Sequence, residues 1–430
     1  MSNDPTSRET IVTRAWVIHP ELTSDRDRRD PGPALEEAVS LADALPDLEV
    51  VGQEVVRLPK AQPGQLFGSG KIEEIAARLE ANEVDLVLID GPVTPVQQRN
   101  LEKRWDVKIL DRTGLILEIF SDRARTREGV LQVEMAALSY QRTRLVRAWT
   151  HLERQRGGLG FVGGPGETQI EADRRAIDEQ LTRLRKQLAK VVKTRELHRA
   201  ARAKVPFPVV ALVGYTNAGK STLFNRMTGA NVMAKDMLFA TLDPTMRGVV
   251  LSSGRKVILS DTVGFISELP TQLVAAFRAT LEEVLGADVI LHVRDISAEG
   301  TAEQAEDVEK ILAELGVGED VPMIEVWNKT DLLPDDERAA REVEAERNAH
   351  VTAISALTGA GVDTLTAMIE AQLAEDSTED AMHLSFADGK ARAWLHEAHV
   401  VTEEVQDESG WQITVSWTTR QKAEFQKFGR

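Results

Sequence analysis

Residues 214–221 read Gly214-Tyr215-Thr216-Asn217-Ala218-Gly219-Lys220-Ser221, which is the spacing G-x-x-x-x-G-K-[ST] of a loop that wraps phosphate groups. An apolar, strand-like stretch precedes this phosphate loop at 207–213, and a helical pattern follows it. The glycines let successive backbone N–H groups point at phosphate oxygens, and the helix adds the positive end of its dipole. Lys220 supplies a charge to the β- and γ-phosphates, and the Ser221 hydroxyl can bind Mg²⁺. The stretch therefore predicts a P-loop α/β domain that binds a nucleotide.

The composition is typical of a multidomain protein from a reducing compartment. A length of 430 residues predicts roughly three domains, and 42% hydrophobic residues suffice for ordinary cores. The absence of cysteine excludes disulfides, thiolate metal sites and a cysteine nucleophile. Residues 1–10 do not have the pattern of a signal peptide, and no apolar run approaches the roughly 18 residues of a membrane span. We therefore expect a soluble, cytoplasmic protein.

Charge is distributed unevenly along the chain. The total net charge is −17, which taken alone argues against a nucleic-acid partner. Residues 111–206, however, hold 20 Lys and Arg against 12 Asp and Glu, a net of +8, so the rest of the chain carries −25. This basic segment is the pattern expected where one element meets a phosphate backbone, although a solvated helical pair with an incidental arginine excess has the same composition.

The hydropathy pattern divides the chain into four parts. We predict an α/β N-terminal domain at 1–111, a long helical hairpin at 112–205 with a Gly-rich tip at 157–166, the P-loop domain with a mostly parallel sheet at 206–375, and a small α+β module at 376–430. In the first part, strands are predicted at 14–18, 84–89 and 107–110, and helices at 35–45 and 71–79. The last part shows strands at 382–386 and 411–417 around one helix, and the acidic stretch at 370–380 is typical of a linker.

Two further segments fit the phosphate end of a nucleotide. A strand at 257–260 leads into Asp261-Thr262-Val263-Gly264, where the carboxylate can hold Mg²⁺ through water and the glycine N–H can meet a γ-phosphate. Between this segment and the phosphate loop, residues 239–245 read as a mobile loop. A threonine there can complete the Mg²⁺ shell, and Thr241 and Thr245 both qualify.

The segment Asn328-Lys329-Thr330-Asp331 selects the base. A carboxylate such as Asp331 accepts from guanine N1–H and N2–H₂ together, whereas adenine has no donor at either place. Asn328 can bond the N7 side of guanine, and the stem of Lys329 can lie over the ring. Farther along, Ser355-Ala356-Leu357 offers the N–H of Ala356 to guanine O6. These residues favour GTP over ATP.

In this order, the motifs resemble those of translation-factor-type GTPases, and over 11–375 the chain resembles the HflX family. The resemblance rests on the phosphate loop, on Phe239–Asp243 and on Asp261–Phe265. It also rests on the Gly-rich run 157–166 followed by Glu167-Thr-Gln-Ile-Glu171, and on Phe67-Gly-Ser-Gly-Lys-Ile-Glu-Glu74. The resemblance implies an α/β N-terminal domain, a long helical hairpin and a GTPase domain, with Mg²⁺ as cofactor and Thr241 as the metal threonine; the tail after 375 carries no motif that matches the family. It further implies binding to the large ribosomal subunit and separation of stalled or idle ribosomes under stress.

The candidate site follows from the motifs and the resemblance together. The metal ligands are Ser221 and Thr241, and the groups expected to act on the phosphates are Lys220, Asn217, Thr241 and Gly264. The residues expected to bind the nucleotide are Gly214, Tyr215, Thr216, Asn217, Ala218, Gly219, Lys220, Ser221, Phe239, Ala240, Thr241, Leu242, Asp243, Asp261, Thr262, Val263, Gly264, Asn328, Lys329, Thr330, Asp331, Ser355, Ala356 and Leu357.

Phe265 stands where Ras-like switches hold the glutamine that orients the attacking water. Phenylalanine cannot bond water, so we predict slow intrinsic hydrolysis, on the order of 10⁻⁴ to 10⁻³ per second. One remedy is a partner that completes the site, and the resemblance names the large subunit. The other is a K⁺ ion seated by Asn217 beside the phosphates; alternatively, Asn217 only shapes the loop.

The hairpin is the predicted arm for RNA. Arg142, Arg144, Arg147, Arg154 and Arg156 precede the tip, and Lys186, Lys190 and Lys193 follow it. We expect a monomer that binds GTP or GDP and, through the hairpin, ribosomal RNA. Two alternatives stay open: a GTPase that modifies or escorts tRNA, and a GTP-dependent switch whose hairpin docks an acidic protein.

Three other patterns were weighed. Gly68-Ser-Gly-Lys71 is half a phosphate loop and offers a second nucleotide site only weakly, because the Ser or Thr after the lysine is missing. His396 and His399 are spaced i and i+3, not the i and i+4 of a zinc helix. We assign Trp394, Trp411 and Trp417 to the core of the C-terminal module.

Overall fold

The computed structural model of the chain describes residues 12–25, 29–155, 165–202, 207–230, 238–239, 245–267, 284–318, 321–375, 377–398, 400–407, 409–418, 421–422 and 425–426. Within these ranges it forms three separate sheets, and no helix there is long and apolar enough to cross a membrane. The chain divides into two compact units. The first comprises 1–189 with 235–243 and 266–278, and the second comprises 190–234, 244–265 and 279–430.

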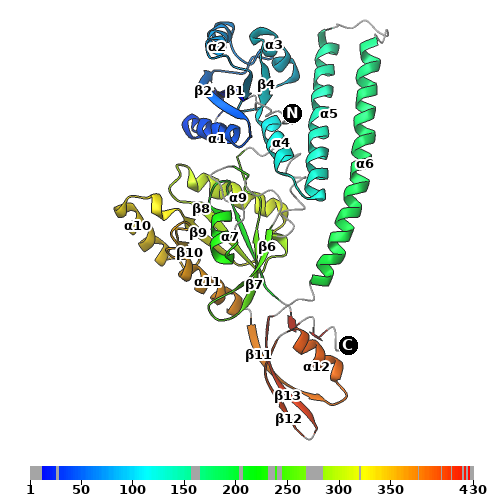
Figure 1. Cartoon of the computed structure of the whole chain (residues 1–430), viewed down its shortest axis with the longest axis vertical. Helices are drawn as coiled ribbons and strands as arrows, with labels where there is room; N and C mark the ends of the chain where they lie inside the picture. The colour runs from blue at the N-terminus through cyan, green and yellow to red at the C-terminus, as the bar shows by residue number, and fades with distance from the viewer. Residues whose placement is uncertain are drawn as a thin grey trace, which may run out of the picture. The chain divides into compact units, whose positions relative to one another are not determined.

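The N-terminal domain is a three-layer α/β fold (Figure 1). Its four strands are all parallel and lie in the order β2-β1-β3-β4. The strands are β1 (Thr13–Leu22), β2 (Leu48–Leu58), β3 (Leu86–Ile89) and β4 (Lys108–Asp111), and the helices are α1 (Pro31–Asp43), α2 (Ser69–Ala81), α3 (Pro95–Trp105) and α4 (Arg112–Arg123). The core between the sheet and the α2–α3 layer contains Ile72, Leu101 and Trp105. The predicted α/β class is therefore confirmed for this part.

Two elements of this domain were not predicted. Strand β2 is continuous but contains Gly52, where a β-carbon would lie 2.1 Å from the ring of Trp16, so the pattern of apolar residues breaks there. Helix α3 has few apolar residues, but the side chains of Thr94 and Gln97 form a reciprocal capping box at its start. Helix α4 packs on β3, β4 and α1, so the N-terminal layers extend to Arg123 and past the predicted boundary at 111.

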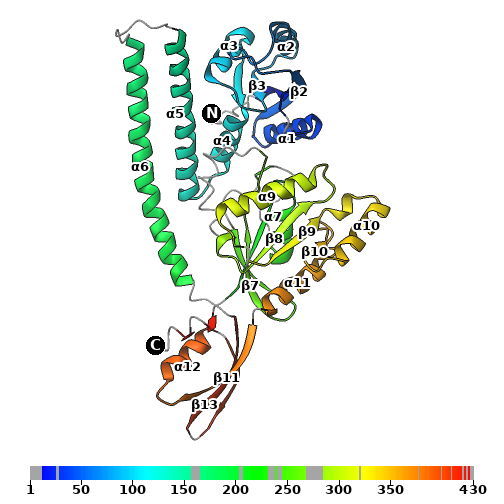
Figure 2. The same cartoon turned by 180° about the vertical axis from the view of Figure 1, so that it is seen from behind.

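The predicted hairpin is formed by two long helices, α5 (Arg127–Gln155) and α6 (Pro165–Arg202), which lie side by side in both views (Figures 1 and 2). The single helical stretch expected before the tip is two helices, because Ala124 is extended and ends α4. On α6, Leu181 and Leu184 are buried and Leu188 is half-buried, as expected for one apolar face of a helix that packs on its neighbour. Arg142 of α5 and Asp178 of α6 form an ion pair of 2.9 Å between the helices. Residues 157–164 of the predicted tip lie outside the described residues.

The P-loop domain contains a six-stranded sheet in the order β10-β9-β8-β5-β7-β6, parallel except for β6. Its strands are β5 (Val209–Gly214), β6 (Thr245–Val250), β7 (Lys256–Asp261), β8 (Val289–Asp295), β9 (Met323–Asn328) and β10 (Val351–Ala353). Its helices are α7 (Lys220–Thr228), α9 (Thr301–Leu315), η1 (Thr330–Leu332), α10 (Asp335–Glu346) and α11 (Val362–Glu375). The predicted mostly parallel sheet is confirmed.

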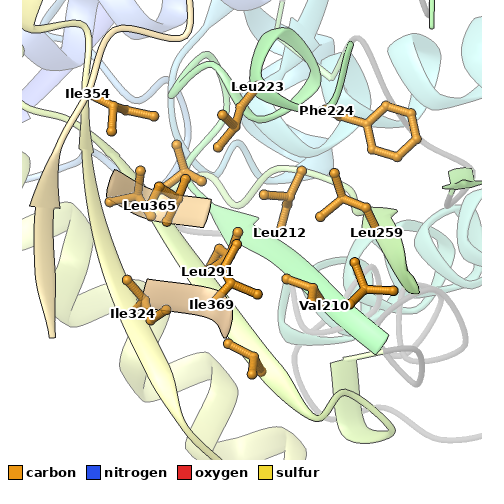
Figure 3. Close-up of a cluster of buried hydrophobic side chains, with 14 of the residues drawn as sticks. Val210, Leu212, Leu223, Phe224, Leu259, Leu291, Ile324, Ile354, Leu365 and Ile369 are labelled. Carbon is orange, nitrogen blue, oxygen red and sulfur yellow. The ribbon is translucent and has the colours of Figure 1, made fainter. Parts of the chain in front are cut away.

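One face of this sheet is sealed by α7 and α11 (Figure 3). Leu212, Leu259, Leu291 and Ile324 of the strands, Leu223 and Phe224 of α7, and Leu365 and Ile369 of α11 form one buried cluster. Burial of such side chains contributes about 1.5–3 kcal/mol each. The cluster holds the sheet against the start of α7, and it thereby holds the phosphate loop at the carboxyl ends of the strands.

The C-terminal module is an antiparallel sheet in the order β11-β13-β12 with one helix (Figure 1). Its elements are β11 (Ser377–Ser385), α12 (Gly389–Glu397), β12 (Val401–Gln406) and β13 (Gly410–Thr418). Strand β12 was not predicted, because its sequence Val-Thr-Glu-Glu-Val-Gln is that of an exposed edge strand. The linker predicted at 370–380 was wrong: α11 continues to Glu375 and β11 begins at Ser377.

Candidate nucleotide-binding site

The predicted motifs meet at one edge of the six-stranded sheet. The phosphate loop follows β5, the Asp-x-x-Gly segment follows β7, the Asn-Lys-x-Asp segment ends β9, and the Ser-Ala segment follows β10. Because these strands are parallel, their carboxyl ends share an edge, which is where open α/β sheets bind ligands. Strand β6, which was not predicted, precedes β7 in the chain, yet β5 and β7 are direct neighbours in the sheet.

Glycines are required at both ends of the phosphate loop. Gly214 has φ +146°, and a β-carbon there would lie 2.1 Å from the carbonyl oxygen of Val293. Gly219 has φ +90°, and a β-carbon there would lie 2.2 Å from Nδ2 of Asn328. Both positions combine a left-handed backbone with a close neighbour, so a side chain would be strained on two counts.

Lys220 begins α7 and is 6% exposed. Its ammonium donates to the carbonyl oxygens of Gly214 at 3.1 Å and Tyr215 at 2.7 Å, so it lies across the loop that it closes. Burial lowers the pKa of Lys220 to about 8, and the nearby charge of Asp261 opposes this shift. A cation held in a buried loop of backbone groups is well placed for phosphate oxygens, whose charge raises its pKa again.

Ser221 and Asp261 supply the oxygen atoms that a magnesium ion needs. The Ser221 hydroxyl donates to Oδ2 of Asp261 at 2.7 Å, and Asp261 is fully buried. Hydroxyl and carboxylate oxygens beside a phosphate site are the ligand set that Mg²⁺ prefers. These residues therefore fit the ion: Ser221 would hold it and Asp261 would contribute negative charge beside it. Thr241, with Ala240, Leu242 and Asp243, lies outside the described residues.

The segment after β7 is tied to the phosphate loop by its backbone. Phe265 N–H donates to Gly214 O at 3.1 Å, and Thr216 N–H donates to Phe265 O at 2.7 Å. A β-carbon on Gly264 would lie 2.8 Å from Cα of Thr216 and 2.9 Å from Nζ of Lys220, so the glycine permits this contact. The Phe265 side chain is 2% exposed and Val263 is also buried. Neither side chain can hold a water, as predicted for Phe265 from its chemistry.

Thr262 and Asn217 have different structural roles within the predicted site. Thr262 is fully buried, and its hydroxyl donates to Leu212 O at 2.6 Å, so it anchors the strand end. Asn217 is exposed, with φ +59°. Asparagine tolerates this left-handed conformation better than most residues, which is an observation in favour of a loop-shaping role.

Asn328 joins two of the loops. Its Nδ2 donates to Ala218 O at 2.8 Å, and its Oδ1 accepts from Ala356 N–H at 2.9 Å. The Ala356 N–H that was expected to meet guanine O6 is therefore paired with Asn328 in this structure. The amide of Asn328 keeps one further N–H, which is the group expected to reach guanine N7.

Asp331 and Lys329 are held by neighbours. The Ser355 hydroxyl donates to Oδ1 of Asp331 at 2.5 Å, which orients the carboxylate. Nζ of Lys329 lies 2.7 Å from Oδ2 of Asp295, at the end of β8. The Thr330 hydroxyl donates to Ile354 O at 3.0 Å and is buried, whereas Leu357 is exposed. Asp295 was missed by the sequence reasoning, although an aspartate at the carboxyl end of an apolar strand was an available signal.

Ser267, which follows the Asp-x-x-Gly segment, contacts residues of the N-terminal domain. The Ser267 hydroxyl lies 2.9 Å from a carboxylate oxygen of Glu37 and accepts from Arg29 at 2.7 Å. Arg112 donates to Ser267 O at 2.9 Å and to Asp90 at 2.6 Å. Burial raises the pKa of Asp90, but the hydrogen bond from His19 and the charges of Arg112 and Arg29 outweigh it and lower the pKa.

Phe239 also contacts the N-terminal domain, through the ring of Phe120. Its ring meets that of Phe120 edge to face, with the ring centroids 4.7 Å apart. Phe239 is buried, with φ +55°. Phe239 and Ser267 therefore both belong to the first compact unit, although they flank the motifs of the second in sequence.

Two arginines of the predicted RNA arm form ion pairs within the protein. Arg144 donates to Asp111 at 2.8 Å and pairs with Tyr140 and Gln98, so its charge is engaged within the protein, and its role as an RNA contact stays a prediction. Arg142 pairs with Asp178. On α6, Lys186, Lys190 and Lys193 are exposed as predicted. The side chains of Arg147, Arg154 and Arg156 lie outside the described residues.

The structure gives the contacts of the remaining candidate residues, which are Lys71, His396 and the three tryptophans. Lys71 pairs with Glu54 at 3.3 Å and Glu74 at 3.1 Å, which leaves its charge committed to carboxylates rather than to a second nucleotide. His396 pairs with Glu404 at 2.5 Å. Trp417 is buried and Trp394 and Trp411 pack around the same small core, as predicted. Within the described residues no group of three or more His, Asp or Glu side chains could hold a metal ion.

A mostly parallel sheet whose carboxyl edge carries these four motifs defines a P-loop GTPase. Matches to family models cover most of the chain: "GTP-binding GTPase N-terminal" over 33–121, "GTP-binding GTPase Middle Region" over 123–202, "50S ribosome-binding GTPase" over 209–329 and "HflX C-terminal domain" over 340–429. The last match extends the family resemblance to the C-terminal module, where the sequence offered no motif.

Curated relatives agree with these models. GTPase HflX of Magnetococcus marinus is 49% identical over 93% of this chain and 89% of its own length. GTPase HflX of Escherichia coli is 43% identical over 92% of this chain and 91% of its own length. A solved structure, that of SsGBP with GDP, matches 84% of this chain and 98% of its own at 24% identity and a TM-score of 0.49. The chain belongs to the HflX family of GTPases.

Proposed function

We propose that this GTPase is a switch whose GTP-bound state associates with the large ribosomal subunit and separates stalled or idle ribosomes under stress. The proposal rests mainly on one observation: the phosphate loop and the carboxylate that suits guanine lie at the same edge of the sheet. The family model over 209–329, described as a 50S ribosome-binding GTPase, supports the choice of partner.

The guanine preference is supported by the setting of Asp331. Ser355 holds one of its oxygens at 2.5 Å, and Asn328 connects the base loops to the phosphate loop. Guanine presents two adjacent N–H donors to such a carboxylate, whereas adenine leaves it unpaired at a cost of about 1–3 kcal/mol or more. Ser221, with the Thr241 that the family resemblance assigns, would hold Mg²⁺, which would supply charge neutralisation at the phosphates of the nucleotide.

Among the described residues, Ser267 and Phe239, which lie close in sequence to the predicted switch motifs, both contact residues of the N-terminal domain. Ser267 lies three residues after Gly264, which is expected to meet the γ-phosphate, and its hydroxyl and carbonyl are held by Arg29 and Arg112. Phe239 lies two residues before Thr241 and packs on Phe120. Movement of either segment on hydrolysis therefore changes contacts of the N-terminal domain.

The exposed basic side of α6 supports RNA as the surface that is recognised. Lys186 and Lys193 are exposed on the same helix whose Leu181 and Leu184 are buried. Lysines on one side of a long helix suit the phosphate backbone of RNA. A monomeric protein in the cytoplasm meets this partner directly.

Slow hydrolysis in the absence of the ribosome follows from the phosphate edge of the site. Phe265 is buried, so its side chain cannot orient water, and Lys220 already lies over the loop. A large subunit that supplies the missing group would raise the rate, and the nucleotide would act as a timer for release.

Co-sedimentation of the full chain with purified subunits, tRNA and whole ribosomes tests the proposal. We expect retention on the large subunit with a non-hydrolysable GTP analogue and release with GDP. Stimulation by tRNA alone, or by a protein alone, without ribosome binding would overturn it in favour of a tRNA-directed GTPase or a protein-docking switch. Light scattering of intact ribosomes then reports whether the analogue complex separates the subunits.

A further inference from the structure

Arg226 connects the helix of the phosphate loop to the loop that reads the base. It lies in the last turn of α7, six residues after Lys220. Its Nε donates to the carbonyl oxygen of Ala356 at 2.6 Å, and its terminal NH2 group donates to the carbonyl oxygen of Leu357. The planar guanidinium thus reaches two consecutive peptide groups through two different nitrogens, in a fixed fork that a lysine side chain does not have.

A glycine in the same loop makes room for this side chain. Gly359 has φ +97°, and a β-carbon there would lie 2.7 Å from NH1 of Arg226. Any side chain at 359 would therefore displace the guanidinium as well as strain the backbone.

The loop held by Arg226 carries the groups that face guanine. Ser355, just before Ala356, donates its hydroxyl to Asp331, and the same oxygen accepts from Thr358 N–H at 3.0 Å. The N–H of Ala356 is bonded to Asn328 at 2.9 Å. A shift of the Ala356 and Leu357 carbonyls would therefore reach the carboxylate of Asp331 and the amide of Asn328 together.

A basic residue at the end of a helix also has a simpler role, since it interacts favourably with the helix dipole. That role would place the guanidinium on carbonyls of α7 itself. Here both described bonds go instead to residues 130 and 131 positions away in the sequence.

We infer that Arg226 is a positioning residue for guanine recognition, which sets the Ser355–Leu357 loop so that Asp331 meets both N1–H and N2–H₂ of the base. The inference rests on the proposed guanine site. It adds to that site a residue outside its motifs, on the helix that binds the phosphates.

The test compares GDP with IDP, which lacks the 2-amino group and so loses one bond to Asp331. Affinities of the full chain are measured by displacement of a fluorescent GDP analogue. We expect wild type to prefer GDP, and Arg226→Ala to lower the GDP-to-IDP affinity ratio roughly fivefold to tenfold through the loss of one aligned hydrogen bond. Arg226→Lys, which keeps the charge but not the fork, is expected to give an intermediate ratio.

Arg255→Ala is the matched control. Arg255 also donates to a backbone carbonyl of the same domain, that of Leu373 at 2.9 Å, but at the end of α11. Its loss is expected to leave the GDP-to-IDP ratio unchanged even where the melting temperature falls. An unchanged ratio in Arg226→Ala, with both affinities altered equally, would overturn the inference and leave the guanine site standing. A wild type without preference for GDP would overturn the guanine site and the inference together.

Discussion

Nζ of Lys329 lies 2.7 Å from Oδ2 of Asp295, and this ion pair joins the ends of β9 and β8 beside the base-reading segment. Lys329 has φ +65°, so its backbone turns sharply where the strand ends. The ion pair directs the lysine stem across the site, where it can cover one face of a purine. Asp295 also accepts from the N–H of Ser297 at 3.1 Å and from its hydroxyl at 2.6 Å.

Asp295→Asn isolates the charge of this pair. Asparagine can still accept from Ser297, so the turn is kept while the ion pair with Lys329 is lost. Both side chains are partly exposed, so we expect GDP to dissociate about fivefold faster, which corresponds to about 1 kcal/mol. Stopped-flow release of a fluorescent GDP analogue measures this rate. Glu344→Ala, which removes the surface pair with Arg341, is the control, and an equal effect there would argue against a specific role for Asp295.

Asp331→Asn is expected to exchange the base preference. The Asn oxygen can still accept from Ser355, but its NH₂ now opposes the 2-amino group of guanine and matches the 2-carbonyl of xanthine. We expect GDP binding to weaken by roughly 10- to 100-fold and XDP binding to strengthen. Titration calorimetry with both nucleotides checks the exchange. If the variant binds both nucleotides as wild type does, the guanine contact assigned to Asp331 is wrong.

The buried Lys220 predicts a pH dependence of nucleotide binding. In the free protein burial lowers its pKa to about 8, and bound phosphates favour the charged form and raise the pKa again. Binding should therefore take up a proton above pH 8, and affinity for GDP should fall with rising pH, by at most tenfold per pH unit. Calorimetry at pH 8.5 in buffers of different ionisation enthalpy measures the uptake. A dissociation constant that is flat from pH 7 to 9.5 would contradict it, and Lys220→Met should lose the dependence.

His292, in the middle of β8, predicts acid sensitivity of the P-loop domain. It is 1% exposed, and its pKa is lowered to about 4 by burial first, then by Arg294 and Lys220, against the opposing charge of Glu325. The unfolded histidine, with a pKa near 6.5, binds its proton first as pH falls. The contribution of the neutral, buried His292 to the unfolding free energy is therefore fully present above pH 6.5, and it is lost as the pH falls from 6.5 to 4.

Urea unfolding at two pH values measures the unfolding free energy that is lost through the protonation of His292. Between pH 7.5 and pH 5, His292 should cost about 2 kcal/mol of unfolding free energy. His292→Gln, which cannot take up a proton, should lose correspondingly less over the same interval. Equal losses in both proteins would mean that other groups account for the acid sensitivity.

Potassium dependence tests the remaining role of Asn217. If its side chain seats a K⁺ ion beside the phosphates, GTP hydrolysis should be severalfold faster in KCl than in NaCl, since one added cation stabilises charge in the transition state. Asn217→Gly is the informative variant, because glycine keeps the φ of +59° while the amide is lost. It should abolish the difference between the salts. Equal wild-type rates in both salts would leave Asn217 with a loop-shaping role alone.

Most of the predicted strands have continuous apolar sequences, although β8, which begins with a buried apolar run, was not predicted. β1, β3, β4, β5 and β7 are buried and read as apolar runs. β2 carries Gly52 under the ring of Trp16, and β12 is a polar edge strand, so neither has the expected pattern. The predicted linker failed for a related reason: acidic residues on exposed faces of α11 and β11 look like solvated chain.

The sequence by itself determined the chemistry of the phosphate loop, because a contiguous motif is built from neighbouring backbone groups. It also determined the order of the four nucleotide motifs. It further supplied a carboxylate at Asp331, the kind of side chain that accepts from the two N–H groups of guanine. Only the tertiary structure decided the partners of these groups, because they come from distant strands. Asn328 pairs with Ala218 and Ala356, Lys329 with Asp295, and Arg144 turns inward to Asp111. Parallel strands bring such residues to one edge irrespective of their separation along the chain.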